Sequence, residues 1–214
     1  LKALEKTKTQ GVSGALVMNA NPFTLGHQYL VETAAAQCDT LHLFVLSEDA
    51  SLVPFAVRKK LVRAGVSHIP NVVLHDSGPY IISSATFPSY FLKDAAAVIE
   101  GHARLDLAVF TKIAGALNVT KRFVGEEPTS QVTGLYNEIM ARELPKAGIE
   151  CHVVPRKQAA GQAISASTVR LALQKGDWET LKMLVPQTTL DYFQSPEAAP
   201  VLKRIRRADN VIHY

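Results

Sequence analysis

The chain has 214 residues and is 47% hydrophobic, enough to bury the core of one domain with at most a small extension. Its net charge of +4 is too small to indicate a nucleic-acid-binding protein. No apolar run reaches the roughly 20 residues that a membrane helix needs, and no basic segment precedes an apolar one as in an export signal. We therefore expect neither nucleic acid nor a membrane as a partner.

Cysteine and histidine usage favours a reduced, cytoplasmic protein without a metal site. The two cysteines, Cys38 and Cys151, are far apart in the sequence, and the seven histidines are scattered without the spacing of metal ligands. The first residue, Leu1, is not a methionine, which indicates a fragment or a processed product. We therefore expect a domain that precedes this chain.

Apolar segments and helical patterns alternate along the chain. Strands are expected at residues 15–18, 41–46, 72–74, 122–125 and 150–155. Helices are expected at residues 26–37, 54–65, 94–117, 131–144, 167–174 and 178–184. This alternation predicts an α/β fold in which right-handed crossovers join five parallel strands and helices cover both faces of the sheet. Ligands of such sheets bind at the carboxyl ends of the strands.

Three parts are expected. Residues 1–10 form a solvated lead-in, and residues 11–185 form the α/β catalytic domain. Residues 186–214 form a helical extension that packs on the same domain or trails it. This extension is polar, is interrupted by prolines and carries the basic cluster Lys203-Arg204-Ile205-Arg206-Arg207.

The first candidate site follows the first strand, in the run 19–27, NANPFTLGH. A helix start offers unpaired N–H groups and the positive end of the helix dipole, which favour an anion. Gly26 allows close approach of the backbone, while the Thr24 hydroxyl and the His27 imidazole can contact a phosphate of a nucleotide. The alternative is structural: His27 caps the helix and Thr24 closes a turn.

The second candidate site follows the fifth strand, in the run 164–170, ISASTVR. Ser165 or Ser167 can cap the helix, Thr168 adds a hydroxyl in its first turn, and helical spacing allows Arg170 to point to the same end. Hydroxyls, free N–H groups and an arginine form a cradle for a polyphosphate. An ordinary serine-rich cap is the alternative, but two anion-ready helix starts in one sheet favour a nucleotide site.

Two further segments follow predicted strands. Carboxylates at Glu126 and Glu127 can hold a ribose or a metal-bound phosphate, and Gly125 would admit the nucleoside; a polar loop is the alternative. The aromatic and hydroxyl-rich segment 80–93 suits a pocket for a second substrate, or simply a packed connecting loop. The basic run 58–60 can face the site, although such runs more often form a solvated helix face.

Together, these segments resemble a superfamily of nucleotidyltransferases with the signatures (H/T)-x-G-H and I-S-S-T-x-x-R. Residues 24–27, TLGH, match the first signature, and residues 164–170 match the second with Ala166 as an extra residue. Within this superfamily the chain is similar to the citrate lyase ligase family at residues 21–27, 83–93 and 124–128. The resemblance covers nearly the whole chain and implies a Rossmann-like nucleotidyltransferase fold.

The resemblance implies an AMP-forming acid–thiol ligase. Such enzymes use ATP and acetate to acetylate the thiol of the CoA-like prosthetic group on the acyl carrier subunit of citrate lyase, and they release AMP and pyrophosphate. The family usually has an N-terminal acetyltransferase-like domain. This chain is therefore expected to be the C-terminal catalytic domain.

Carried onto this sequence, the resemblance assigns catalysis to Thr24, His27 and Arg170. Thr24 and His27 stabilise the charge that develops as acetate attacks the α-phosphorus of ATP, giving acetyl-adenylate. Ser167, Thr168 and Arg170 hold the departing pyrophosphate, with Mg²⁺ sharing its charge. Further contacts to the nucleotide are expected from Asn19, Asn21, Pro22, Phe23, Gly26, Gly125, Glu126, Glu127, Ile164 and Ser165. Contacts to acetate or to the arm of the carrier are expected from Ser83, Ser84, Thr86 and Lys93.

Two other functions stay open. An adenylyltransferase that joins AMP to a phosphate ester, such as phosphopantetheine or a nicotinamide nucleotide, would keep AMP in its product. A nucleotide-binding regulatory domain would show no turnover. The basic cluster at 203–207 is expected to dock the acidic carrier protein or to be solvated, with nucleic-acid binding less favoured.

Overall fold

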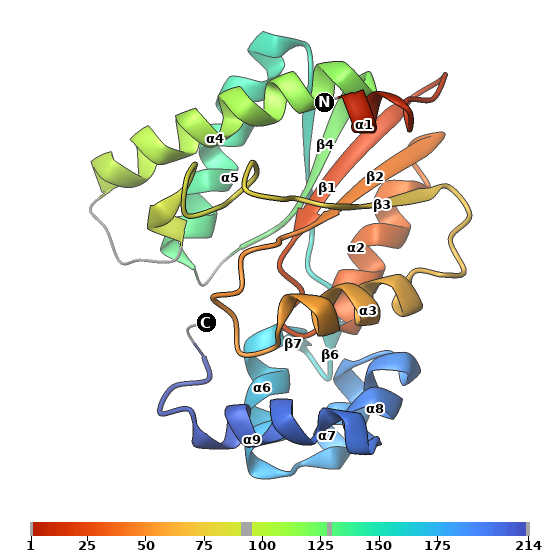
Figure 1. The fold of residues 1–214 in the computed structure, drawn as a ribbon, viewed down its shortest axis with the longest axis vertical. Coiled ribbons are helices and arrows are strands. Elements are labelled where there is room, and N and C mark those ends of the chain that lie inside the picture. Colours follow the sequence, from red (N-terminus) through yellow and green to blue (C-terminus); the bar gives the residue numbers. More distant parts are fainter. Residues whose placement is uncertain (1, 91–95, 128–129, 213–214) are drawn as a thin grey trace. The chain divides into compact units, whose positions relative to one another are not determined.

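In the computed structural model, residues 2–90, 96–127 and 130–212 are described, and the chain forms two compact units (Figure 1). Unit 1 comprises Leu1–Met18, Glu32–Glu48 and Asn71–Pro155. Unit 2 comprises Asn19–Val31, Asp49–Pro70 and Arg156–Tyr214. Each unit therefore gathers three stretches that are distant in the sequence.

Unit 1 is built on a five-stranded sheet. Its strands are β1 (Ser13–Met18), β2 (Thr40–Val45), β3 (Val72–Asp76), β4 (Val119–Gly125) and β5 (Glu150–Val154). They are all parallel, in the spatial order β3-β2-β1-β4-β5. The order reverses at β1, so right-handed crossovers place α2 (Leu25–Ala35) on one face and α4 (Ala96–Leu117) and α5 (Gln131–Glu143) on the other. The expected α/β fold is confirmed.

Strands β1 and β2 are almost wholly buried because a parallel sheet is covered on both faces. All six residues of β2 are buried, and so are five of the six in β1. Strand β4 begins at Val119, three residues before the expected start at Arg122. The polar residues Thr120 and Lys121 hide the beginning of this strand in the sequence.

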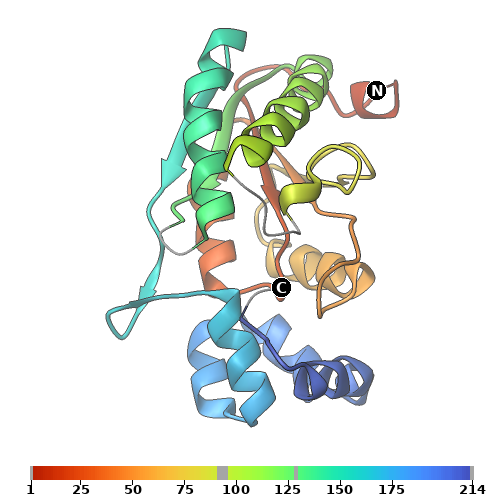
Figure 2. The ribbon, with the colours of Figure 1, turned by 90° about the vertical axis from the view of Figure 1, so that its left-hand side faces the viewer.

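Helix α4 presents an apolar stripe to the core of unit 1. Ile99, Ala103, Leu107, Phe110 and Ala114 recur every three or four residues and are all buried. Helix α5 adds Tyr136, Ile139 and Met140 to the same cluster. Figure 2 shows the two helices side by side on one face of the sheet.

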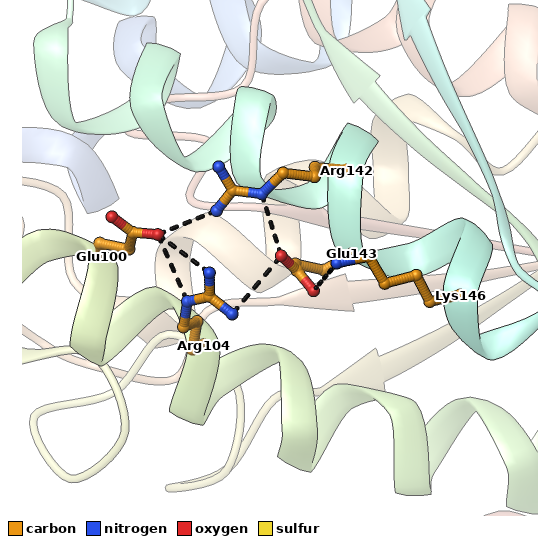
Figure 3. Close-up of polar contacts among 5 residues, drawn as sticks. All are labelled: Glu100, Arg104, Arg142, Glu143 and Lys146. Atoms are coloured by element: carbon orange, nitrogen blue, oxygen red, sulfur yellow. Dashed lines mark hydrogen bonds and ion pairs between the residues drawn. The ribbon is translucent and has the colours of Figure 1, made fainter.

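Ion pairs bridge the solvent side of α4 and α5 (Figure 3). Glu100 accepts from Arg104 at 3.0 Å and from Arg142 at 2.9 Å, and Glu143 accepts from Arg142 at 2.9 Å and from Lys146 at 2.8 Å. Hydrogen bonds from Lys146 and Arg142 lower the pKa of Glu143 to about 2. Because exposed pairs are screened by solvent, the buried stripe rather than this network carries most of the packing energy.

Unit 2 is mainly helical. It holds α3 (Phe55–Gly65), α6 (Ala166–Lys175), α7 (Trp178–Leu184), α8 (Gln187–Gln194) and α9 (Ala199–Arg207), and helix α2 begins in it. The last two of these helices confirm that the C-terminal extension is helical. The domain limits expected at residues 10 and 185 stay predictions.

A short hairpin was not expected between the fifth strand and α6. Strands β6 (Gln158–Ala159) and β7 (Gln162–Ala163) are antiparallel and are joined by Ala160 and Gly161, whose φ angles are +49° and +76°. Two left-handed residues form a tight hairpin turn, but alanine is an uncommon choice at the first of them. Strands of only two residues are also too short to show the alternation of apolar and polar residues that predicts a strand.

The expected lead-in contains a four-residue helix, α1 (Lys2–Glu5), and three short 3₁₀ segments lie at Pro88–Tyr90, Leu144–Ala147 and Pro196–Ala198. Within the described residues, no helix combines the length and the apolar character that crossing a membrane requires.

Candidate active site

The loop after β1 is tied down at both ends within unit 2. The Asn19 side chain donates to the Ser51 hydroxyl at 3.0 Å. The side-chain oxygen of Asn21, Oδ1, accepts from the Val53 N–H at 3.0 Å. The Asn21–Pro22 peptide bond is cis, and Ala20 has φ +52°. Asn21 and Pro22 are buried, so this segment is a fixed platform in front of α2.

Arg58 reinforces that platform, which corrects the expectation of a solvated basic face at 58–60. The Arg58 side chain is fully buried. Its Nη1 donates to the Asn19 carbonyl at 2.9 Å, and its Nε donates to the Val53 carbonyl at 3.0 Å. Lys60, in contrast, is exposed and pairs with Glu197. This difference between Arg58 and Lys60 is not visible in the sequence, because a main-chain carbonyl acceptor has no residue signature.

Thr24 and His27 form a reciprocal cap at the start of α2. The Thr24 hydroxyl accepts from the His27 N–H at 3.2 Å, and His27 Nδ1 accepts from the Thr24 N–H at 3.1 Å. This is the geometry of a capping box with histidine in place of the usual glutamate. The structural interpretation, in which Thr24 and His27 cap the start of the helix, is therefore correct. The cap uses only the Nδ1 atom of the His27 ring and leaves Nε2 outside it.

The state of the His27 ring follows from these bonds. A main-chain N–H can only donate, so Nδ1 is an acceptor and the neutral ring carries its proton on Nε2. Burial, together with the charges of Arg156 and Arg170, lowers the pKa of His27 to about 4. At neutral pH the ring is therefore an uncharged N–H donor in a positive field.

Two glycines permit the packing around this helix start. A Cβ on Gly26 would lie 3.3 Å from the Ile164 carbonyl oxygen, so the absence of a side chain lets the first turn of α2 approach the segment before α6. A Cβ on Gly65 would lie 2.2 Å from the ring of Phe23. Phe23 is fully buried and stacks on His27 with ring centroids 5.8 Å apart.

Ser165 caps α6 and Ser167 does not. The Ser165 hydroxyl accepts from the Thr168 N–H at 3.1 Å and lies 2.8 Å from the Thr168 hydroxyl. The Ser167 hydroxyl donates instead to the Ile212 carbonyl at 3.1 Å. The N–H groups of the first turn, before Thr168, have no acceptor within the helix and suit an anion.

Arg170 is buried and holds main-chain carbonyl groups. Its Nε donates to Val211 at 2.5 Å, its Nη1 to Asn21 at 2.6 Å and its Nη2 to Ile212 at 2.8 Å. A longer bond of 3.3 Å reaches the Ser167 hydroxyl. Burial lowers the pKa of Arg170 to about 10, so the group stays charged at neutral pH. The two predicted helix starts thus meet, joined by Arg170 and by the contact of Gly26 with Ile164.

The third candidate belongs to unit 1. The Gly125 carbonyl accepts from Asn137 at 2.9 Å, and the Glu126 N–H continues the sheet by donating to the Val154 carbonyl at 2.9 Å. A Glu127 carboxylate oxygen accepts from the Ser130 N–H at 3.0 Å, in front of α5. These are the contacts that the polar-loop alternative predicts.

The fourth candidate also belongs to unit 1, and its hydroxyls fold their own loop. The Ser83 hydroxyl donates to the Pro79 carbonyl at 2.9 Å, and the Thr86 hydroxyl donates to buried Asp106 at 2.8 Å. The Ser84 N–H donates to Glu48 at 2.9 Å, and the Ser84 side chain is exposed. These bonds match the packed-loop alternative. Lys93 lies outside the described residues.

Arg156 is a site residue that the sequence did not single out. It lies two residues after Val154, the carboxyl end of the parallel strand β5, and its charge acts on His27. Its neighbour Lys157 places its ammonium group 5.9 Å from the ring of Tyr29. In the sequence, only the position of Arg156 after a predicted strand could have marked it as a candidate site residue.

The chemistry of this cluster is that of an anion site and not of a metal site. Its side chains are arginines, hydroxyls and a neutral histidine, and nowhere in the described residues do three or more His, Cys, Asp or Glu side chains gather as metal ligands. Any Mg²⁺ that accompanied a bound polyphosphate would be held by phosphate oxygens rather than by these side chains. The residues themselves can bind phosphate groups and stabilise negative charge.

A family model for the C-terminal domain of citrate lyase ligase matches residues 13–193. The chain is 46% identical over 197 residues to the citrate (pro-3S)-lyase ligase of Haemophilus influenzae, covering 89% of this chain and 59% of that protein. It is 45% identical over 188 residues to the protein of the same name from Escherichia coli K12, covering 85% and 53%. The chain thus spans little more than half the length of these relatives.

Solved structures share the fold at low identity. TmcAL of Thermotoga maritima, bound with alpha-thio ATP, gives a TM-score of 0.53 at 14% identity, over 86% of this chain and 55% of that one. A bifunctional NMN adenylyltransferase/ADP ribose pyrophosphatase of Francisella tularensis, complexed with AMP and a manganese ion, gives 0.56 at 12% identity, over 92% and 52%. At these identities the likeness concerns the fold alone.

Proposed function

Since the chain belongs to the citrate lyase ligase family, we propose that it is the catalytic domain of an ATP-dependent, AMP-forming ligase. Its substrates in this proposal are ATP with Mg²⁺, acetate, and the prosthetic-group thiol on the acyl carrier subunit of citrate lyase. The observation that carries the proposal is the meeting of two helix starts around one buried arginine and one neutral histidine.

The first step is adenylation of acetate. An acetate oxygen forms a bond to the α-phosphorus of ATP, and the bond from this phosphorus to the bridging oxygen of pyrophosphate breaks. In the second step, the carrier thiolate attacks the carbonyl carbon of acetyl-adenylate, a thioester forms and AMP leaves. No side-chain nucleophile takes part, so the protein acts by positioning and by stabilising charge.

His27 is suited to the first step because its Nε2–H donates without carrying a charge of its own. A donor that is fixed before the reaction, in a partly buried site, stabilises the extra charge on the α-phosphate as the phosphorus becomes pentacoordinate. Thr24 fixes the ring through Nδ1, and Phe23 supports its face. Nucleotide contacts from Asn19, Asn21, Pro22 and Gly26 belong to the same proposal.

The pyrophosphate is held, in this proposal, at the start of α6. Thr168 and the first N–H groups of the helix face the anion, while Ser165 supports Thr168. Arg170 contributes its charge and keeps Asn21 and Ser167 in place through hydrogen bonds. Arg156 adds a second positive charge near His27. The roles of Gly125, Glu126 and Glu127 for the nucleoside, and of Ser83, Ser84 and Thr86 for acetate or the carrier, stay predictions.

The test is acetate-dependent exchange of labelled pyrophosphate into ATP, which requires the first step alone. We expect exchange in the unchanged chain and a loss of about 100-fold or more in the variant His27→Ala, as for removal of an oxyanion donor. The variant His68→Ala, at an exposed histidine of unit 2, is the control and should retain the exchange.

Other outcomes would point to the other two functions. AMP found covalently in a product formed from a phosphate ester would identify an adenylyltransferase. Saturable ATP binding without exchange or AMP release, in this chain and in a longer protein that contains it, would identify a regulatory nucleotide-binding domain.

A further inference from the structure

Helix α9, labelled in Figure 1, lies near the end of the chain. Its burial pattern gives it one buried face and one cationic face. Val201 and Ile205 are buried, and the helix packs against α6. The opposite face consists of exposed basic side chains, Lys203, Arg204, Arg206 and Arg207. Four cations on two turns of one helix concentrate positive charge at a single place on unit 2.

These four cations have no acidic partner anywhere in the part of the chain that the structure describes. Other exposed lysines of unit 2 do have one: Lys60 pairs with Glu197 at 2.6 Å, and Lys182 pairs with Glu179 at 2.8 Å. Asp209, two residues beyond the helix, is exposed as well. The charge of this face is therefore available to an outside partner.

The helix does not need these side chains to cap its end. Basic residues often compensate the carbonyl groups at a helix C-terminus. Here the Gln174 amide already donates to the Ala208 carbonyl at 3.0 Å and to the Ile205 carbonyl at 3.4 Å. Capping by itself therefore does not account for the basic cluster.

A shallow depression lies beside these cations. Leu52, Pro200 and Ala208 line it together with Lys203, Arg204 and Arg207. Protein–protein interfaces combine apolar and charged side chains. A nucleic-acid surface would need a longer track of cations or aromatic side chains for stacking, and this depression has no aromatic lining.

The cationic face is also close in the chain to the proposed catalytic residues. Three residues after Ala208, the Val211 carbonyl accepts from Arg170, and the next carbonyl, of Ile212, does so as well. Both α9 and this carbonyl pair belong to unit 2, which holds Thr24, His27 and Arg170. A partner bound to α9 would thus bind to the same unit that holds the proposed adenylation site.

From these observations we propose that the exposed face of α9, with the depression beside it, is the docking surface for an acidic protein. That protein is the macromolecular acyl acceptor, so the inference rests on the function proposed above. Complementary charge accelerates encounter and makes it salt-dependent, and the apolar residues that line the depression supply contact area. The small substrates, ATP and acetate, do not require this surface.

The test compares two charge-reversal variants of the full chain with equal net charge. One carries Lys203→Glu, Arg204→Glu and Arg207→Glu; the control carries Lys2→Glu, Lys6→Glu and Arg63→Glu, at exposed positions elsewhere. The probes are the fluorescently labelled acyl carrier subunit of citrate lyase and a short double-stranded DNA. Carrier binding is titrated at low and high salt, and acetate-dependent pyrophosphate exchange is measured on the same samples.

We expect the α9 variant to bind the carrier at least about tenfold more weakly than the control, with a smaller salt dependence and unchanged exchange. Equal carrier binding by both variants would overturn the docking surface while leaving the proposed function intact. Binding of DNA that is as tight as that of the carrier, and lost in the α9 variant, would overturn it in favour of nucleic acid. Absence of exchange in the unchanged chain would reject the proposed function, and the titration would still decide the docking surface.

Discussion

Two surface arginines of unit 1 and one buried arginine of unit 2 have different hydrogen-bond partners. In unit 1, Arg104 and Arg142 lie on the surface and share the carboxylates of Glu100 and Glu143 (Figure 3). In unit 2, Arg170 is buried and donates to three main-chain carbonyl groups and one hydroxyl. A carboxylate cancels the charge of an arginine, whereas a carbonyl satisfies its hydrogen bonds and leaves the charge uncancelled.

This difference explains the electrostatics of the proposed active site. Burial lowers the pKa of His27 most, and the charges of Arg156 and then of Arg170 lower it further. The same field would attract a polyphosphate. The arginine pairs on α4 and α5 stabilise a surface and create no comparable field. What an arginine is bonded to, rather than its presence, thus distinguishes a binding site from a surface network.

The largest effect is expected from Arg170→Ala, which would leave the Asn21 and Val211 carbonyl groups without their donor. Each buried acceptor that loses its partner costs about 1–3 kcal/mol, so we expect a decrease of about 3 kcal/mol or more in the free energy of unfolding. ATP binding should be lost as well. Urea denaturation and calorimetric titration with ATP measure the two effects.

The matched control is Arg142→Ala, which removes an exposed arginine of the surface network. Its urea midpoint and its affinity for ATP should stay close to those of the unchanged chain. If Arg142→Ala proved as damaging as Arg170→Ala, the comparison between the two kinds of arginine would be wrong.

The second prediction concerns pH. The folded pKa of His27 is about 4 against an ordinary 6.5, so between these values the unfolded chain binds more protons and stability falls as pH falls. The decrease in the free energy of unfolding that is attributable to His27 reaches up to about 3 kcal/mol at the acid end of this pH range. In the variant His27→Gln, the free energy of unfolding should fall less steeply as pH is lowered from 6.5 to 4.

A control for this slope lies in unit 1. Burial, followed by the nearby His75, also lowers the pKa of His42 to about 4, and His42→Gln should remove a comparable slope. The two variants should differ in one respect: the pyrophosphate exchange is lost in His27→Gln and retained in His42→Gln. An unchanged slope in both variants would contradict the assigned ring states.

The third prediction uses two helix glycines. Gly65→Ala would push the Phe23 ring away from its place against His27, and overpacking of this kind costs about 1–3 kcal/mol. In Gly101→Ala, on α4 of unit 1, the new methyl group meets no atom within 4 Å, so better helix propensity should stabilise the chain by about 0.5–1 kcal/mol. Thermal unfolding should show shifts of opposite sign; two shifts of the same sign would refute the assigned packing.

The smallest effect is expected from Glu143→Gln in the surface network. Hydrogen bonds from Lys146 and Arg142 lower the pKa of Glu143 to about 2, so it is ionised throughout the neutral range. Because its side chain and partners are in contact with water, the unfolding midpoint should change little, and less still at high salt. A large shift that salt does not reduce would mean that the network is a structural element and not a solvated surface.

Local patterns carried most of the fold prediction. The five strands are predictable because each contains a short apolar stretch, and the helices because apolar side chains recur with helical period, as on α4. The sequence predicts a cap by Ser165 or Ser167, and Ser165 is the residue that caps α6. This is predictable because capping depends on a hydroxyl within three residues of its N–H donor. The hairpin β6–β7 was missed because two-residue strands have no pattern to detect.

The sequence by itself therefore determined the alternation of strands and helices, the parallel sheet, and the two helix-start motifs, proposed to bind phosphate, that lie together in unit 2. Only the tertiary structure decided which side chains serve each signature. It buried Arg58 beneath the loop after β1, brought Arg156 to His27 and connected Arg170 with Asn21, which lies 149 residues away in the sequence. The physical reason is that Arg58 and Arg170 bond to main-chain carbonyl groups, which every residue possesses, so no residue type marks the partner in advance.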